Sequence, residues 1–352
     1  MKDITVLTTA CAAMFMPGFF RCLKENGERR IKIIGVDMAA DPMMGQLLDG
    51  YYQVGACTAP GYVEQLLDIC RRERVDVFFP HISTELPIIL ARIAEFRQLG
   101  VRVAITDSQT LLVANNKRKL YEAMTAGGLP TPAFYPISSS QDLKKYAPLL
   151  GYPDRPVVVK AAESSGSRGV RVVRADLSRA DAFLHSKPSS LNISMEEMCR
   201  TLDECQPMPD LLVMEYLPGC EYTVDLLADR GETLYIAGRR NYESSMSIAM
   251  ASRMEPKEEA FALCRQIIQL LKLDGNIGFD FMLDENDRPV LTDLNPRITA
   301  TIVLYLAGGL NLPYLRVKQL LGETLPEVKV EYGAHLKRRY LDVIQMPQQE
   351  QP

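Results

Sequence analysis

The chain lacks the residues that several common reaction types require. It contains three histidines among 352 residues, and its eight cysteines include no C-x-x-C pair. This scarcity argues against a zinc site of the usual ligand spacing and against Ser-His-Asp or Cys-His catalysis. The net charge is −4 and no run of Lys or Arg is longer than three residues, which argues against a nucleic-acid partner.

Long hydrophobic runs are also missing. The apolar stretch 298–310 is too short to span a bilayer. The stretch 4–20 is interrupted by threonines and Pro17 and follows Lys2-Asp3, so it does not have the basic start of a signal peptide. Scattered cysteines and sixteen methionines fit a reducing compartment. We therefore expect a cytoplasmic protein with no membrane partner.

Two nucleotide-binding fingerprints are absent. The predicted first strand, 4–7, is followed by Thr8-Thr9-Ala10-Cys11-Ala12, where a dinucleotide-binding protein would have G-x-G-x-x-G. Without these glycines there is no tight pyrophosphate cradle, so NAD is not expected. The chain also has no G-x-x-x-x-G-K-[ST] sequence, which excludes a P-loop.

The first ~110 residues have a pattern of alternating strands and helices, which is typical of a parallel α/β sheet. We predict strands at 4–7, 32–37, 75–80 and 102–105, and helices at 16–26, 61–73 and 83–99. A break is expected at 107–116, followed by a helix at 117–126. Later elements mix strands with helices, including helices at 257–271, 299–308 and 313–321. We expect the polar tail 346–352 to lack structure.

The segment 276–297, NIGFDFMLDENDRPVLTDLNPR, predicts a hairpin with a polar site. Phe279 and Phe281 alternate with Asp280, as in a half-buried strand. On the second strand Asp293, Asn295 and Arg297 share one side, because successive side chains change face. Two carboxylates and an amide oxygen are ligands that Mg²⁺ prefers, and it usually shares them with nucleotide phosphates. The alternative is a hairpin whose acids face water.

Lys160 ends the predicted strand 156–160, whose preceding residues are three valines. A partly buried ammonium group needs an anion, and either a nucleotide phosphate or a carboxylate would serve. The Ser/Gly-rich loop 164–169 follows, and its backbone N–H groups can bind phosphates. The alternative for this loop is a simple hairpin turn.

Residues 214–219, MEYLPG, join two predicted strands. Such a hinge presents backbone groups that can bind an adenine edge, and Glu221 can accept hydrogen bonds from ribose hydroxyls. A strand-turn-strand segment with an exposed acid is the alternative.

The order of these motifs resembles the ATP-grasp superfamily, within it the branch of carbamoyl phosphate synthase large chains and biotin carboxylases. The resemblance runs from about Lys117 to Gly322. It implies a parallel αβ pre-ATP-grasp domain followed by a two-subdomain α+β ATP-grasp fold. The expected borders are 1–113 for the first domain and 114–328 for the second, with a lid at about 130–214 and a catalytic part at about 215–328. A C-terminal segment, 329–352, follows.

The resemblance also implies roles for individual residues. ATP phosphates would be bound by Lys117, Lys160, Ser165, Gly166, Ser167 and Gly169, and the nucleoside by Glu215, Tyr216, Leu217 and Glu221. One or two Mg²⁺ ions, for which Mn²⁺ can substitute, would be bound by Asp280, Asp293 and Asn295. The catalytic residues would be Arg297, Lys160 and Arg168. The family usually has Glu at the position of Asp293, so metal geometry can differ here.

The implied reaction is the ATP-dependent, ADP-forming ligation of a small-molecule carboxylate to an amine. One of Arg239, Arg240 and Arg253 is a candidate for binding the substrate carboxylate, and either Arg239 or Arg240 should face solvent because neighbours on a strand point in opposite directions. Two alternatives remain: a bicarbonate-activating enzyme of the carbamoyl phosphate or carboxylase type, and a non-catalytic ATP-binding subunit. A homodimer is the default expectation.

Overall fold

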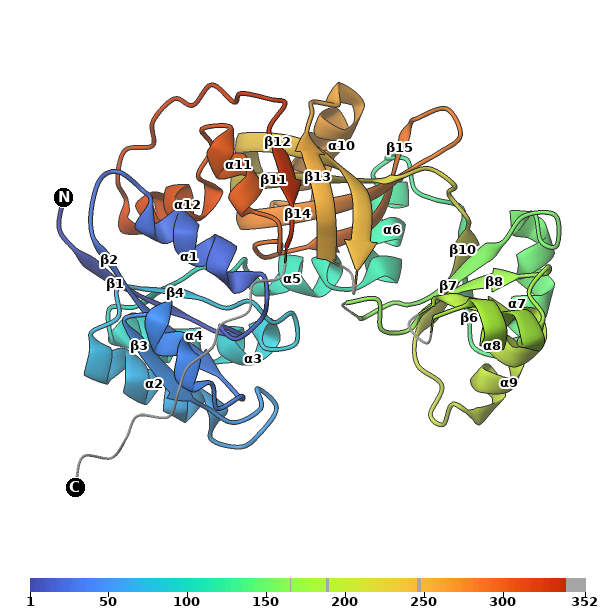
Figure 1. Ribbon diagram of the computed structural model, residues 1–352, viewed down its shortest axis with the longest axis horizontal. Coiled ribbons are helices and arrows are strands. Elements are labelled where there is room, and N and C mark those ends of the chain that lie inside the picture. The colour runs from blue at the N-terminus through green and yellow to red at the C-terminus, as the bar shows by residue number, and fades with distance from the viewer. Residues whose placement is uncertain (165, 188–189, 246–247, 340–352) are drawn as a thin grey trace. The chain divides into compact units, whose positions relative to one another are not determined.

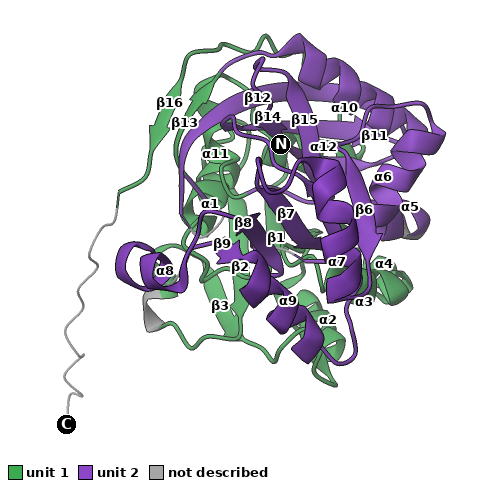
Figure 2. Ribbon diagram, turned by 90° about the vertical axis from the view of Figure 1, so that its right-hand side faces the viewer, with its two compact units in different colours: residues 1–105, 250–254, 300–352 green, residues 106–249, 255–299 purple. Residues whose placement is uncertain are grey.

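The computed structural model describes residues 1–164, 166–187, 190–245 and 248–339. The chain divides into two compact units, which Figure 2 shows in different colours. Unit 1 contains residues 1–105, 250–254 and 300–352, and unit 2 contains residues 106–249 and 255–299. Within the described residues no helix is both long and apolar enough to cross a membrane.

Unit 1 is built around a five-stranded sheet in which every pairing is parallel. The strand order is β3-β2-β1-β4-β5, so the central strand β1 is the first in the chain. The strands are β1 (Ile4–Thr8), β2 (Ile31–Asp37), β3 (Gly50–Gln53), β4 (Val77–Phe79) and β5 (Arg102–Val103). The α/β class predicted from the alternating pattern is confirmed.

The helices of this unit are α1 (Met16–Lys24), α2 (Tyr62–Glu73), α3 (Leu86–Ala91), α4 (Ile93–Gln98), α11 (Val303–Ala307) and α12 (Leu312–Leu321), with a 3₁₀ turn η1 (Pro42–Gln46). Helix α1 packs against α11 and α12 (Figure 1). At one contact a Cβ atom on Gly18 would lie 2.9 Å from Val303 Cγ1. Strand β13 (Ile248–Met254) pairs antiparallel with β16 (His335–Lys337).

Three element predictions for the chain were wrong. The single helix expected at 83–99 is two helices, because the N–H of Arg92 bonds three residues back to Ile89 and ends the first. The break expected at 107–116 contains α5 (Ser108–Ala114), which Asp107 caps by accepting a hydrogen bond from the N–H of Gln109. The helix expected at 299–308 is reduced to α11. The tail 346–352 lies outside the described residues.

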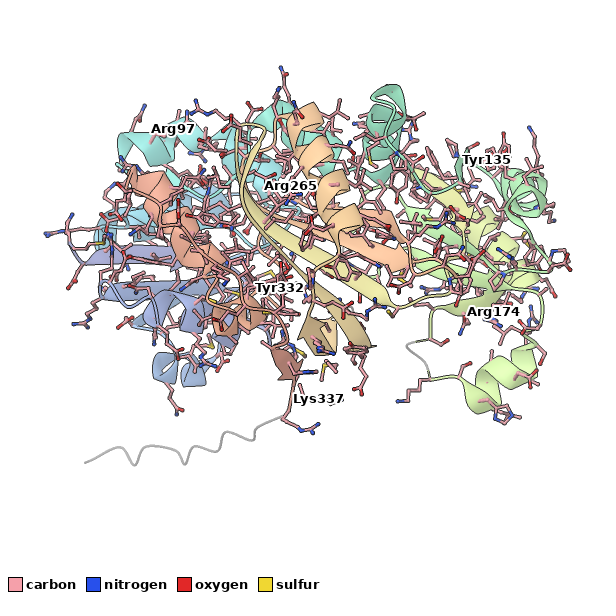
Figure 3. The ribbon with its side chains drawn as sticks, turned by 90° about the horizontal axis from the view of Figure 1, so that it is seen from above. Arg97, Tyr135, Arg174, Arg265, Tyr332 and Lys337 are labelled. Carbon is pink, nitrogen blue, oxygen red and sulfur yellow. The ribbon has the colours of Figure 1, made fainter. Side chains whose placement is uncertain are left out.

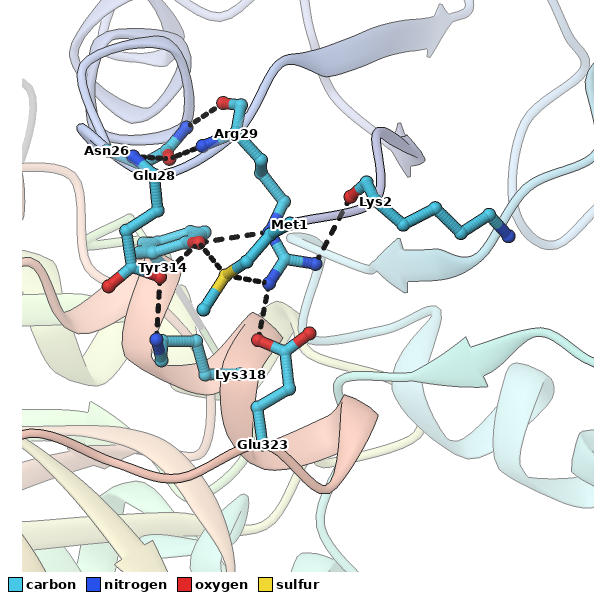
Figure 4. A network of polar contacts seen from close by, with 8 residues as sticks. All are labelled: Met1, Lys2, Asn26, Glu28, Arg29, Tyr314, Lys318 and Glu323. Carbon is cyan, nitrogen blue, oxygen red and sulfur yellow. Dashed lines mark hydrogen bonds and ion pairs between the residues drawn. The ribbon is translucent and has the colours of Figure 1, made fainter.

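A network of charged side chains connects the loop at 26–29 with α12 in unit 1 (Figure 4). The Arg29 side chain is almost fully buried, donates to the Tyr314 hydroxyl at 3.0 Å and pairs with Glu323. Lys318 Nζ donates to Glu28 Oε2 at 2.6 Å, and Tyr314 donates to the same oxygen at 2.9 Å. Every buried charge in this network therefore has a partner of opposite sign, as burial requires.

Unit 2 contains two sheets. The first has the order β6-β10-β7-β8-β9, in which only the β8–β9 pairing is parallel. Its strands are β6 (Phe134–Ile137), β7 (Val157–Ala161), β8 (Val170–Arg174), β9 (Asn192–Ser194) and β10 (Leu211–Glu215). Helices α7 (Ser140–Tyr146) and α9 (Met195–Glu204) contribute to its apolar core, and η2 (Ala147–Leu150) and α8 (Arg179–His185) complete this part. Tyr135, labelled in Figure 3, stacks on Tyr146 with ring centroids 4.6 Å apart.

The second sheet has antiparallel strands in the order β15-β14-β11-β12. These are β11 (Glu221–Asp229), β12 (Glu232–Ser245), β14 (Gly275–Leu283) and β15 (Pro289–Asn295). One face of the sheet is apolar and shares a core with α6 (Lys117–Ala126) and α10 (Glu258–Leu271). The exposed Arg265 marks the outward side of α10 in Figure 3. Since alternate side chains fill this core, the remaining ones lie on the opposite face.

Candidate functional site

The opposite face of the second sheet of unit 2 is polar, and we call it the polar face. On β11 the sequence E-Y-T-V-D places a polar residue at every second position, while the intervening Tyr222 and Val224 belong to the core. Thr223 lies opposite Arg239 on β12 and opposite Asp280 on β14. Asp280 in turn lies opposite Asp293 on β15. The polar face consists of Glu221, Thr223, Asp225, Arg239, Asn241, Asp280, Asp293 and Asn295.

Asp280 is at the centre of this face. Its Oδ1 accepts a hydrogen bond of 2.9 Å from the Thr223 hydroxyl, and its Oδ2 accepts one of 2.9 Å from Asn295 Nδ2. Burial, together with the negative charges of Glu221 and Asp293, raises the pKa of Asp280 to about 7. A carboxyl group perturbed in this way is typical of a site that binds a cation or handles a proton.

Asp293 is 32% exposed and forms an ion pair with Lys117, whose ammonium group lies 3.3 Å from its Oδ2. Lys117 is the first residue of α6 and its side chain is 5% exposed. Its Nζ also donates to the carbonyl oxygen of Ser164 at 3.3 Å. The predicted phosphate-binding lysine and the predicted metal ligand are therefore in direct contact.

Asn295 and Arg297 are two residues apart along the chain, and both lie near Asp280. Arg297 donates through Nη2 to Asn295 Oδ1 at 3.2 Å and through Nη1 to the carbonyl oxygen of Ile298 at 3.1 Å. Burial lowers the pKa of Arg297, and the carboxylates of Asp280 and Asp293 oppose this effect. The two acids, the amide and the arginine expected from the hairpin are thus brought together.

Lys160 lies on β7, where it is opposite Leu212 of β10 and Val170 of β8. Burial lowers its pKa, while the negative charge of Asp293 raises it and the nearby Lys117 lowers it further. Lys160 and Lys117 therefore place two positive charges near Asp293, and an anion bound between the lysines would be stabilised.

The Ser/Gly loop connects β7 with β8. Gly166, Ser167 and Gly169 all have positive φ angles, between 56° and 65°, and a Cβ atom on Gly169 would lie 2.8 Å from Ala161 Cβ. Ser165 lies outside the described residues. Arg168 is exposed. Backbone N–H groups in such a conformation can bind an anion.

The hinge region contains Glu215, Tyr216 and Leu217. Glu215 ends β10, and its Oε1 accepts a hydrogen bond of 2.8 Å from the N–H of Ala133. Leu217 is buried. The N–H of Gly219 donates to the carbonyl oxygen of Leu283 at 2.9 Å, and any side chain on Gly219 would overlap this oxygen. The hinge is therefore attached to the end of β14, the strand that bears Asp280.

Glu221 is the first residue of β11 and accepts a hydrogen bond of 3.0 Å from the Ser244 hydroxyl. It is close enough to Asp280 to raise the pKa of that group. It lies two residues after Gly219, so one carboxylate is present between the hinge and the acidic pair.

Neither Arg239 nor Arg240 lies free on the surface, so that expectation was wrong. Arg239 is buried on the polar face in an ion pair with Asp225. Arg240, on the other face, is only 21% exposed and pairs with Glu255 and Asp287. Arg253 is exposed on β13 in unit 1. Two of the three candidate carboxylate-binding arginines are thus already paired with carboxylates.

Three polar residues of the site were not singled out from the sequence. Thr223 donates to Asp280, Asn241 Nδ2 donates to Thr223 at 3.0 Å, and Asp225 pairs with Arg239. The signal was present, because polar residues alternate with apolar ones along 221–225. Such alternation also occurs in any strand with one solvated face. It therefore identified these residues as part of the site only after the register of β11 with β12 and β14 was known.

Two family models match the chain. Residues 207–341 match "ATP-grasp in the biosynthetic pathway with Ter operon", and residues 19–104 match "PylC-like, N-terminal domain". The first match covers β10 to β16 and therefore includes the whole polar face, whereas the second covers most of the parallel sheet region of unit 1.

Curated relatives are similar over most of the chain. The arginine-specific large chain of carbamoyl phosphate synthase from Halalkalibacterium halodurans is 23% identical over 295 residues, which cover 81% of this chain and 26% of the relative. The formate-dependent phosphoribosylglycinamide formyltransferase of Parasynechococcus marenigrum is 28% identical over 306 residues, 84% of this chain and 72% of the relative. The chain spans about a quarter of the length of the carbamoyl phosphate synthases that it matches.

Among solved structures, biotin carboxylase from Campylobacter jejuni has the same fold, with a TM-score of 0.70 at 17% identity, covering 94% of this chain and 74% of that one. The resemblance and the fold class expected from the motifs are confirmed by these matches. The matches thus support the resemblance of this chain to the ATP-grasp superfamily, in the branch of carbamoyl phosphate synthase large chains and biotin carboxylases.

Proposed function

We propose that the protein is an ATP-dependent ligase that activates a small-molecule carboxylate as an acyl phosphate, releases ADP, and transfers the acyl group to an amine. The observation that carries this proposal is the direct opposition of Asp280 and Asp293, with Lys117 on Asp293 and Arg297 beside Asn295. This arrangement combines a cation site with fixed positive charges. Phosphoryl transfer depends mainly on positioning and charge neutralisation of that kind. The relative named as a formate-dependent formyltransferase is in line with a carboxylate substrate.

For ATP, we propose that Lys117 and Lys160 bind the phosphates together with backbone N–H groups of the loop at 165–169 and the Arg168 guanidinium. The adenine would lie at Glu215, Tyr216 and Leu217, where the chain leaves β10, and Glu221 would accept hydrogen bonds from the ribose. The burial that lowers the pKa of Lys160 supports this assignment, since a partly desolvated ammonium group gains most from a bound anion.

The residues present also fit Mg²⁺. Asp280 and Asp293 offer hard oxygen ligands from neighbouring strands, and Asn295 can add an amide oxygen after rotation of the amide that now donates to Asp280. Among the described residues no group of three His, Cys, Asp or Glu side chains forms a ligand set, and Mg²⁺ commonly completes its shell with phosphates and water. When bound, the ion would neutralise phosphate charge. We propose one or two ions, with Mn²⁺ as a substitute.

In the proposed reaction a carboxylate oxygen attacks the γ-phosphorus of ATP, and the bond to the β,γ-bridging oxygen breaks to release ADP. The amine nitrogen then attacks the acyl carbon, and inorganic phosphate leaves as the amine loses a proton. Arg297 would stabilise the charge of the transferring group, a role in which an arginine can contribute about 10³-fold or more.

The test is to incubate the purified protein with Mg·ATP and pooled amino acids and small carboxylic acids, and to measure ADP, AMP and phosphate. We expect ADP that depends on one pool and on Mg²⁺, and its loss in Lys160→Ala and Asp293→Ala. Lys144→Ala, a change of an exposed lysine on α7, serves as the matched control. AMP as the product would overturn the proposal.

Two other outcomes have defined meanings. ADP formation with bicarbonate as the only acceptor would favour the carboxylase-type alternative. ATP binding without turnover in any pool would favour a non-catalytic subunit. Two observations support that alternative: Asp293 has a shorter side chain than the Glu usual in the family, and it forms an ion pair with Lys117. We also propose a homodimer, which light scattering coupled to gel filtration tests directly.

A further inference from the structure

Asp225 is a buried carboxylate on β11, two residues beyond Thr223, which lies opposite Asp280. The proposed reaction gives Asp225 no role. Its side chain is 2% exposed and that of its ion-pair partner, Arg239, is 4% exposed. Its second oxygen, Oδ1, accepts a hydrogen bond of 2.8 Å from the Thr299 hydroxyl. Each carboxylate oxygen therefore has its own partner, one from β12 and one from the segment after β15.

Thr299 lies two residues beyond Arg297, and the backbone geometry around it is tight. Asp225 is opposite Gly278 on β14, and Gly278 is opposite Asn295 on β15. A Cβ atom on Gly278 would overlap the methyl group of Thr299 and lie 3.1 Å from Asp225 Oδ1. The glycine thus allows the threonine to lie against β14 and to reach Asp225 across it.

The short segment between Asn295 and Thr299 is consequently held at both ends. At its start, the N–H of Arg297 donates to the carbonyl oxygen of Asn295 at 2.8 Å, and the guanidinium donates to the Asn295 side chain. At its end, the hydroxyl of Thr299 is hydrogen-bonded to Asp225, which Arg239 holds in turn. The conformation of Arg297 therefore depends on a carboxylate that lies beyond its own strand.

A role in stability alone does not account for this pair. Buried ion pairs can often be replaced by apolar side chains of similar volume without loss of stability, so the pair contributes more to local geometry than to net stability. The charges also act over distance. Asp225 is among the carboxylates that oppose the lowering of the Arg297 pKa, and Arg239 counteracts the rise in the pKa of Asp280.

We propose that Asp225, held by Arg239 and hydrogen-bonded to Thr299, is a positioning residue that orients Arg297 toward the transferring phosphoryl group. The role in turnover rests on the proposed function, whereas the orientation of Arg297 can be measured without it. A displacement of about 1 Å at a catalytic group can lower the rate about 10²-fold. Loss of the Thr299 hydroxyl should therefore reduce kcat and leave the KM for ATP nearly unchanged.

The experiment compares Thr299→Val, which keeps the shape and removes the hydroxyl, with Thr299→Ser, which retains it. Thr201→Val is the matched control, because it also removes a threonine hydroxyl that donates a hydrogen bond, here to the carbonyl oxygen of Glu197 within α9. Arginine-labelled protein gives guanidinium NMR signals, and Arg297→Lys assigns the signal of Arg297. We expect Thr299→Val to average the two Nη signals of Arg297 and Thr299→Ser to keep them distinct. Unchanged Arg297 signals in Thr299→Val would overturn the proposal.

Turnover supplies the second readout through a double-mutant cycle. We expect Thr299→Val to lower kcat about 10- to 10²-fold in the wild-type background and less than twofold in Arg297→Ala, because its effect passes through Arg297. An equal loss in both backgrounds would overturn the proposal. If the wild-type protein forms no ADP with any acceptor, the proposed function fails, and the NMR comparison still decides whether Asp225 and Thr299 orient Arg297.

Discussion

The raised pKa of Asp280 leads to a prediction about stability that does not depend on the substrate. Its ordinary value is 3.8, and in the folded protein it is about 7, chiefly because the group is buried and secondly because Glu221 and Asp293 repel its charge. Below about pH 4 the carboxyl group is protonated in both states and has no effect. Between pH 4 and 7 only the folded state retains the proton, so this group makes the protein less stable as the pH rises.

The magnitude follows from the size of the shift. About three pKa units at about 1.4 kcal/mol each correspond to an upper limit of about 4 kcal/mol above pH 7. Asp280→Asn removes the charge and keeps the shape. One of the two hydrogen bonds, to Thr223 or to Asn295, must rearrange, at a cost of about 1–2 kcal/mol. We therefore expect metal-free Asp280→Asn to be about 2 kcal/mol more stable than the wild type at pH 8.

Calorimetry in the presence of EDTA measures this difference. For a unit of this size, about 2 kcal/mol corresponds to a rise in Tm of roughly 4–8 °C at pH 8. At pH 5 only about one of the three pKa units has taken effect, and this loss of about 1.5 kcal/mol offsets the hydrogen-bond cost of the substitution, so the two proteins should differ little. The same variant should lose Mg²⁺-dependent ADP formation. A lower Tm of Asp280→Asn at pH 8, or an equal difference at both pH values, would refute the reasoning.

Two further predictions concern neighbouring features. Asp225→Ala should lower the free energy of unfolding by about 3–5 kcal/mol, because it removes the carboxylate that pairs with the buried Arg239. Asp225→Leu combined with Arg239→Met should recover most of this loss. Urea denaturation measures both variants, and failure of the double variant to recover stability would contradict the prediction. Gly219→Ala should weaken ATP binding and lower the Tm, because the new methyl group overlaps the carbonyl oxygen of Leu283. Gly45→Ala is the control, because no atom lies within 4 Å of the added Cβ. Equal ATP affinity and equal Tm of the two variants would exclude the clash.

Much of the parallel sheet could be predicted from local sequence. The strands β1 and β2 were predicted to within a residue at each end, because runs of Ile and Val between polar loops have strong periodicity. Strand β3 was missed because it has only four residues, Gly50–Gln53, which are partly exposed and form no apolar run. The break within 83–99 lies at Arg92, and neither Gly nor Pro is adjacent to that position to indicate it.

For the site, spacing along one strand was sufficient to group Asp293, Asn295 and Arg297, and the hairpin brought Asp280 to them. The ion pair of Lys117 with Asp293 joins residues 176 positions apart, and the pairing of Arg239 with Asp225 depends on the register between β11 and β12. No local pattern specifies such contacts, since a shift of one residue in register would move every side chain to the other face.

The sequence by itself indicated the resemblance to the ATP-grasp superfamily, the α/β class and the residue types that gather at the site, because periodicity and motif order can be read along the chain. Only the tertiary structure decided which charges meet. The antiparallel register placed Asp280 opposite Asp293 and next to Thr223, and burial then raised the pKa of Asp280 and paired Arg239 with Asp225. Both effects arise from desolvation and proximity, which exist only after distant strands have come together.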